Sequence, residues 1–287
     1  MKTSHKPLTS IVLALLLFFT AQFIAGFTAV IVYHILHPDC YDVDPASITA
    51  SEPRLLLYCM AAAYLVMVPM LFVLGLVRRN CAAAGPRRLP ISRQVEALGL
   101  LLLLTLGCSC LGAVLQLPDD GTSELFTRFK DYPVSWPLLC LLGPLFEELI
   151  FRENLARQFH LWGLRPAFAA AISALSFGLI HLNLAQGVPA AILGFVLGLY
   201  YFRTGNIRLC LAAHVLNNST AMVLLFFPEV EAAIAGLPSV WLWVAAGGSF
   251  VVCGCGLYLR LFRGAGSLSL RVPPPPPIAR DCAAGAA

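Results

Sequence analysis

The sequence predicts an all-α protein, a polytopic bundle of about eight transmembrane helices with both termini in the cytoplasm. Of its 287 residues, 59% are hydrophobic and only 12% are charged. Soluble domains average about 45–50% apolar and roughly 25% charged residues, so this composition is typical of an integral membrane protein. The apolar residues also gather in stretches near the length of about 20 residues that a helix needs to cross a membrane.

Each apolar stretch is expected to form one membrane helix. The first is longer than the apolar core of a signal peptide, about 7–15 residues, and is therefore interpreted as an uncleaved helix. The fifth and sixth are short and are joined by Asn-Leu-Ala-Gln-Gly, which predicts a tight helical hairpin. In chain order, the predicted spans are 9–33, 54–77, 94–117, 135–151, 166–182, 187–202, 208–227 and 238–262.

The basic residues predict the orientation of these spans. With a cytoplasmic N-terminus, all but three of the 19 Lys and Arg residues fall in cytoplasmic segments or at the adjoining helix ends, the exceptions being Arg54, Arg128 and Lys130. The loops on the other side collect acidic residues instead. This is the pattern of the positive-inside rule. The net charge of +4 follows from this anchoring, so it does not indicate a nucleic-acid partner.

The cysteines give no sign of a metal site. Most of the ten lie inside apolar runs, and no Cys-x-x-Cys pair occurs in the chain. They are therefore interpreted as small apolar residues of the helix surfaces.

Polar side chains inside the membrane are concentrated in three of the predicted spans. A buried ionisable group in lipid costs several kcal/mol, so such residues usually line a cavity or carry a function. The residues singled out are Glu147 and Glu148 in the fourth span with Arg152 directly after it, His181 in the fifth, and His214 and Asn218 in the seventh.

Helical geometry separates the two adjacent carboxylates. Glu148 and Arg152 are four residues apart, in the favourable acid-first order, so they are expected to form a structural clamp. Glu147 is rotated by about 100° from Glu148. Its own helix offers only Ile150 and Phe151 at the positions three and four residues on. A partner for Glu147 must therefore come from another helix.

One carboxylate, two imidazoles and one amide are the groups of a hydrolytic centre. Glu147, assisted by His181, can take a proton from water. His214 and Asn218 can donate hydrogen bonds to the oxyanion of a tetrahedral intermediate. Alternatively, Glu147, His181 and His214 can hold Zn²⁺. No HExxH motif occurs, so no metal is assigned and the cofactor is left open.

Three short motifs carry a resemblance to a known family. EELIFR fits the pattern EExxxR, FGLIH fits FxxxH with Phe177 and His181, and HVLNN fits HxxxN. Over residues 135–226 the chain resembles the CPBP family of intramembrane proteases, which includes the type II CAAX prenyl endopeptidases and the Abi and bacteriocin-immunity proteins.

The resemblance implies a bundle with a conical cavity open to the cytosol. It also implies that Glu147 and His181 activate water, that His214 and Asn218 form the oxyanion hole, and that Glu148, Arg152 and Phe177 are structural or position substrate. Whether such proteins use a glutamate or a metal stays open. The alternatives to a protease are a non-catalytic membrane scaffold or immunity factor, and a small-solute transporter.

The predicted activity is that of an endopeptidase that cuts a peptide or membrane-protein substrate near the cytoplasmic membrane face, with CAAX-type C-terminal processing as one form. The expected partners are this substrate and membrane lipid, and no oligomeric state is predicted. In a bacterium the protein would lie in the inner membrane. Four regions are expected: 1–134 with three spans of unassigned role, 135–227 as the catalytic core, 228–262 with the final span, and 263–287 as a cytoplasmic proline-rich tail.

Overall fold

The computed structural model describes residues 6–39, 51–77, 90–119 and 121–262. The predicted proline-rich tail at 263–287 lies outside them. No strand occurs among the described residues. Their helices, with η marking π-helical turns, are α1 (Pro7–Leu36), α3 (Pro53–Val73), α4 (Ile91–Leu115), α5 (Thr122–Phe129), α6 (Ser135–Pro137), η2 (Leu138–Leu142), α7 (Gly143–Glu148), η3 (Leu149–Ala156), α8 (Arg157–Leu161), α9 (Pro166–Leu179), α10 (Leu184–Thr204), α11 (Ile207–Leu224), α12 (Pro228–Ala235), α13 (Ser239–Leu257) and η4 (Tyr258–Phe262).

The chain is an integral, multi-pass membrane protein. Within the described residues, six helices are long and apolar enough to cross a membrane, namely α1, α3, α4, α10, α11 and the helix that begins at Ser239. The fourth predicted span is helical throughout and continues past residue 151 to Leu161. The fifth corresponds to α9, whose 14 residues extend about 21 Å, less than the hydrocarbon thickness of about 30 Å. The all-α bundle is thus confirmed, while the count of eight spans stays a prediction.

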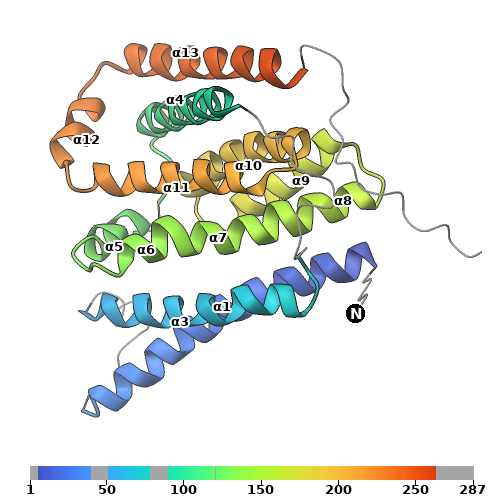
Figure 1. The fold of residues 1–287 in the computed structure, drawn as a ribbon. Coiled ribbons are helices and arrows are strands. Elements are labelled where there is room, and N and C mark those ends of the chain that lie inside the picture. Colours follow the sequence, from blue (N-terminus) through green and yellow to red (C-terminus); the bar gives the residue numbers. More distant parts are fainter. Residues whose placement is uncertain (1–5, 40–50, 78–89, 120, 263–287) are drawn as a thin grey trace, which may run out of the picture.

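The helices pack in layers around the central helical segment α6–α8. Figure 1 shows α1 and α3 on one side of this segment, and α4 and α13 together on the far side of the bundle. Helices α9, α10 and α11 lie between α4 and the central segment. The fourth, fifth and seventh predicted spans, which carry the polar motifs, therefore meet in the interior.

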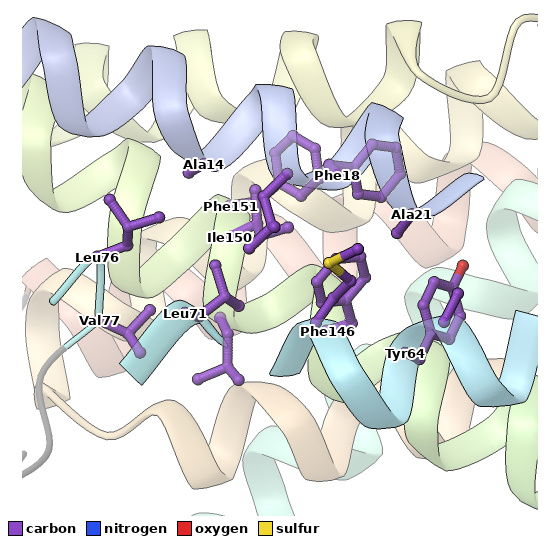
Figure 2. Close-up of a cluster of buried hydrophobic side chains, with 14 of the residues drawn as sticks. Ala14, Phe18, Ala21, Tyr64, Leu71, Leu76, Val77, Phe146, Ile150 and Phe151 are labelled. Carbon is purple, nitrogen blue, oxygen red and sulfur yellow. The ribbon is translucent and has the colours of Figure 1, made fainter. Parts of the chain in front are cut away.

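An aromatic core fixes the rotation of the central helix. Phe18 of α1 stacks on Phe146 with ring centroids 5.8 Å apart, and Tyr64 of α3 lies 4.9 Å from the same ring. Figure 2 shows Phe146, Ile150 and Phe151 gathered with Phe18 in this cluster. These side chains pack the central helix against α1 and α3, while Glu148, two residues after Phe146, reaches His214 of α11.

Helices α9 and α10 form the predicted hairpin and touch through glycines. A Cβ atom at Gly198 would lie 2.8 Å from the Cβ of Ala170, and one at Gly178 would lie 2.6 Å from the carbonyl oxygen of Gly187. Both distances are shorter than real Cβ contacts allow. Small residues at such positions let two membrane helices approach closely.

We expect Gly198→Ala to destabilise the protein by about 1–3 kcal/mol, because the new methyl group overpacks the α9–α10 contact. The control is Gly247→Ala in α13, where a Cβ atom meets nothing within 4 Å. There the higher helix propensity of Ala predicts equal or slightly greater stability. Denaturant titration in detergent micelles measures both variants. Equal stability of the two would contradict the close contact.

Candidate active site

The central helix departs from α-helical geometry on both sides of the two glutamates. The π turns η2 and η3 flank α7, which ends at Glu148. Each π turn shifts the backbone hydrogen bonds by one residue, and π turns inside helices occur frequently at functional sites. Ser173 of α9 donates a hydrogen bond to the carbonyl oxygen of Phe151 in η3, which attaches α9 to this part of the helix.

Glu148 and Arg152 form the predicted ion pair, with Nη1 of Arg152 3.0 Å from Oε1 of Glu148. Their side chains are 1% and 0% exposed, so the pair lies in the protein interior and not at a helix end. The guanidinium of Arg152 lies over the ring of Phe177 at 4.7 Å. A Cβ atom at Gly194 would come within 3.1 Å of both side chains, so the glycine makes room for them.

Glu148 has a second role that the sequence analysis missed. Nδ1 of His214 donates a hydrogen bond to Oε1 of Glu148 over 2.8 Å. The prediction paired Glu148 with Arg152 alone because this cation lies in the same helix. A carboxylate has lone pairs for several donors, so one cation does not saturate it. Glu148 therefore holds both the arginine and the imidazole of His214.

Glu147 finds a partner on another helix, as expected. Its Oε2 lies 3.5 Å from Nε2 of His214. The imidazole thus stands between the two adjacent carboxylates, with one ring nitrogen toward each. The two differ in access, because the side chain of Glu147 is 18% exposed whereas that of Glu148 is fully buried.

His181 lies near this group but does not pair with a carboxylate of the described residues. Its Nδ1 is 2.8 Å from the carbonyl oxygen of Phe177. Because a carbonyl oxygen only accepts, Nδ1 carries the proton and Nε2 of a neutral ring is left as an acceptor. The ring of Phe177 meets His181 edge-on at 5.1 Å and His214 at 5.6 Å. Phe177 therefore lies against both predicted catalytic histidines and Arg152.

Asn218 follows His214 by one turn of α11 and faces the central helix. Its Nδ2 donates a hydrogen bond to the carbonyl oxygen of Leu139 in η2 over 2.9 Å. An amide nitrogen carries two protons, so this bond leaves a second donor. The structure thus places Glu147, Glu148, Arg152 and His214 in direct contact, with Asn218 and His181 joined to them through η2 and Phe177.

The zinc alternative does not fit this arrangement. In the part of the chain that the structure describes, no three His, Cys, Asp or Glu side chains are grouped so that they could hold a metal ion. Of the three ligands considered, Glu147 and His214 approach each other, but His181 does not complete the set. Nδ1 of His214 is also committed to Glu148.

Comparisons with known proteins agree with the motifs. Residues 130–220 match the family described as "Type II CAAX prenyl endopeptidase Rce1-like", and this segment contains all the predicted site residues. The uncharacterized protein YyaK of Bacillus subtilis is 25% identical over 233 residues, which cover 76% of each chain. A second Bacillus subtilis protein, described as "Putative membrane peptidase YdiL", is 25% identical over 110 residues, 38% of this chain and 45% of its own length.

No solved structure matches the chain. Together, these matches confirm the predicted resemblance to the type II CAAX prenyl endopeptidases. The family match over residues 130–220 and the likeness to the putative membrane peptidase support membrane proteolysis as the general activity.

Proposed function

We propose that the protein is an intramembrane endopeptidase in which Glu147 is the base that activates water. The observation that carries this proposal is the difference between the two adjacent carboxylates. Oε1 of Glu148 is held by Arg152 and His214, and the whole side chain is buried, so a substrate water does not reach this carboxylate. Glu147 is partly exposed, and its Oε2 lies 3.5 Å from Nε2 of His214 in the neighbouring helix α11.

In the proposed reaction, Glu147 removes a proton from water while the water oxygen attacks the carbonyl carbon of the peptide bond. His181 offers Nε2 as the second acceptor for this water, because its Nδ1 proton is committed to the Phe177 carbonyl. The proton taken by Glu147 then passes to the nitrogen of the leaving amine. The carbon–nitrogen bond breaks, and the products are a carboxylate and an amine.

His214 and Asn218 are the proposed donors to the oxyanion. When both ring nitrogens of His214 carry protons, Nδ1 donates to Glu148 and Nε2 can donate to the intermediate. Asn218 contributes the amide proton that is not used by Leu139. Fixed donors in a site of low dielectric stabilise a developing negative charge far more than donors in water do.

The proposed substrate is a peptide or membrane protein with a bond near the cytoplasmic face. His214 lies two turns into α11, so it is about 10 Å along the helix from Ile207. In the predicted orientation α11 begins at the cytoplasmic side. The site would then lie in the cytoplasmic half of a hydrocarbon layer about 30 Å thick. Processing of a lipidated C-terminus is one reaction that this depth permits.

A comparison of membrane proteomes tests the proposal and identifies the substrate. Strains that carry the wild-type chain or Glu147→Gln are compared for the N-termini and C-termini of their membrane proteins. We expect at least one terminus that depends on Glu147. The matched control is Glu124→Gln, which removes an exposed acid of α5 that pairs with Arg128. Identical termini in all strains would overturn the proposed activity.

A further inference from the structure

Three hydrogen bonds connect α4 to the central helix by way of α11. Oγ1 of Thr105 lies 2.8 Å from Oδ1 of Asn217, although the two residues are 112 positions apart. Nδ2 of Asn217 lies 3.1 Å from Oδ1 of Asn218. Nδ2 of Asn218 in turn lies 2.9 Å from the carbonyl oxygen of Leu139. The proposed oxyanion donor Asn218 is therefore held at both ends of its amide group.

These three bonds form a hydrogen-bond chain, and the Leu139 carbonyl at its end sets the direction of the bonds between the side chains. A carbonyl oxygen only accepts, so Asn218 must turn its NH₂ group toward Leu139 and its oxygen toward Asn217. Asn217 must then donate with its own NH₂ group, which leaves its oxygen for Thr105. The single hydroxyl proton of Thr105 has two acceptors within reach, this oxygen at 2.8 Å and the carbonyl oxygen of Leu101 at 3.0 Å. When the proton is donated to Asn217, all three bonds are consistent with one orientation of each amide.

The carbonyl oxygen of Leu139 lacks a backbone N–H donor because of the local sequence. In an α-helix it would accept from the N–H of Gly143, but this N–H donates to the carbonyl of Leu138 in the π turn. The next residue, Pro144, has no N–H to offer. An unpaired buried carbonyl costs free energy, and the side chain of Asn218 supplies the missing donor.

We infer that Thr105 and Asn217 are positioning residues that fix the amide of Asn218 in the orientation required of an oxyanion donor. This inference rests on the proposed function, and it gives the third predicted span a role in the reaction. The terminal torsion of an asparagine is intrinsically broad, so an unsupported amide samples several orientations. Removing one oxyanion donor altogether costs about 10²–10³ in kcat, and loosening one is expected to cost part of this.

A purely structural role makes a different prediction. Thr105 and Asn217 lie on adjacent helices, and hydrogen bonds between membrane helices contribute about 0.6 kcal/mol on average. If these residues only joined the helices, their loss would lower stability slightly and leave the turnover of folded protein unchanged. The positioning role instead predicts that loss of either residue lowers kcat and leaves KM unchanged. It also predicts that this loss of kcat occurs only when Asn218 is present.

Kinetics on matched threonine variants separate the two roles, using a peptide that the wild type cleaves and Glu147→Gln does not. We expect Thr105→Val to lower kcat about tenfold, and Thr105→Ser, which keeps the hydroxyl, to restore it. The control is Thr220→Val in α11. In both threonines Oγ1 lies within hydrogen-bond distance of the carbonyl oxygen four residues earlier, but only Thr105 also reaches another helix. A wild-type kcat for Thr105→Val would overturn the inference.

A double-mutant cycle adds a readout that general damage would not reproduce. In the Asn218→Ala background, Thr105→Val is expected to have no further effect on kcat, because the group that it positions is gone. Additive losses in the double variant would show that Thr105 acts through other residues, and would overturn the inference.

Nuclear magnetic resonance of the full chain in detergent micelles tests the hydrogen-bond chain without any substrate. With ¹⁵N-labelled asparagine, the side-chain signal of Asn218 is assigned by its absence in Asn218→Ala. We expect Thr105→Val to shift this signal and to speed its exchange with water, and Thr220→Val to leave it in place. An unmoved Asn218 signal overturns the inference. A moved signal in a protein that cleaves no peptide supports the hydrogen-bond chain and rejects the proposed function instead.

Discussion

Replacing Glu147 with Gln is expected to lower kcat for peptide hydrolysis by about 10³-fold or more. General-base catalysis contributes typically about 10²–10⁴ to an enzymatic rate, and glutamine cannot take a proton from water. The substitution keeps the size of the side chain and an oxygen that can face His214. The measurement is single-turnover cleavage of the peptide identified by the membrane proteome comparison, with purified protein in micelles or liposomes.

The fold is expected to tolerate this change, which separates a catalytic effect from unfolding. Glu147 is 18% exposed and lies 3.5 Å from its closest nitrogen partner, so it is not an acid committed to a buried ion pair. We expect the free energy of unfolding to stay within about 1 kcal/mol of the wild type, as for most partly exposed positions. Turnover at the wild-type rate by a folded Glu147→Gln protein would reject Glu147 as the base.

Most of the bundle could be predicted because the length and composition of an apolar stretch identify a membrane helix. Each of the eight apolar stretches contains a helix in the structure, although several of these helices end a few residues before the predicted span does. The short helices α5 and α12 were not predicted, since eight residues are too few to show a clear apolar period. The fifth span was predicted to continue to residue 182, but α9 ends at Leu179.

The π turns around the glutamates could not be predicted from their own residues. Pro144 shows that a donor is missing, but a proline alone indicates only a kink or a break. The shift of hydrogen bonds in η2 and η3 is supported by side chains from other helices, Asn218 on the Leu139 carbonyl and Ser173 on that of Phe151. Those contacts depend on tertiary packing, which the periodicity of a single helix does not reveal.

The candidate site shows the same division between local and tertiary information. The spacing of Glu148 and Arg152 predicted their ion pair. His181 was predicted within the fifth span, but it lies two residues beyond the end of α9. The bond from His214 to Glu148 crosses 66 positions of sequence and could not be inferred from any spacing. It changes the interpretation of Glu148, because the residue now orients a predicted catalytic histidine in addition to neutralising Arg152.

This dual role leads to the second large effect. Arg152→Met is expected to lower the free energy of unfolding by about 3–5 kcal/mol, because it leaves the buried carboxylate of Glu148 without its counter-charge. The effect is measured by denaturant titration in mixed micelles. The matched control is Arg128→Met, which breaks an exposed ion pair of the same spacing and should cost about 0–1 kcal/mol.

The double variant Glu148→Leu/Arg152→Met distinguishes a clamp from a residue that orients His214. Removing both charges together is expected to restore much of the stability lost in Arg152→Met, since replacing a buried ion pair by apolar residues is often neutral. Activity should nevertheless stay lost, because His214 no longer has an acceptor for its Nδ1 proton and its ring is free to turn away from Glu147. If the double variant recovered stability and turnover together, Glu148 would be a structural clamp alone. Stability without turnover would show that the second glutamate of the motif serves the reaction by holding the histidine.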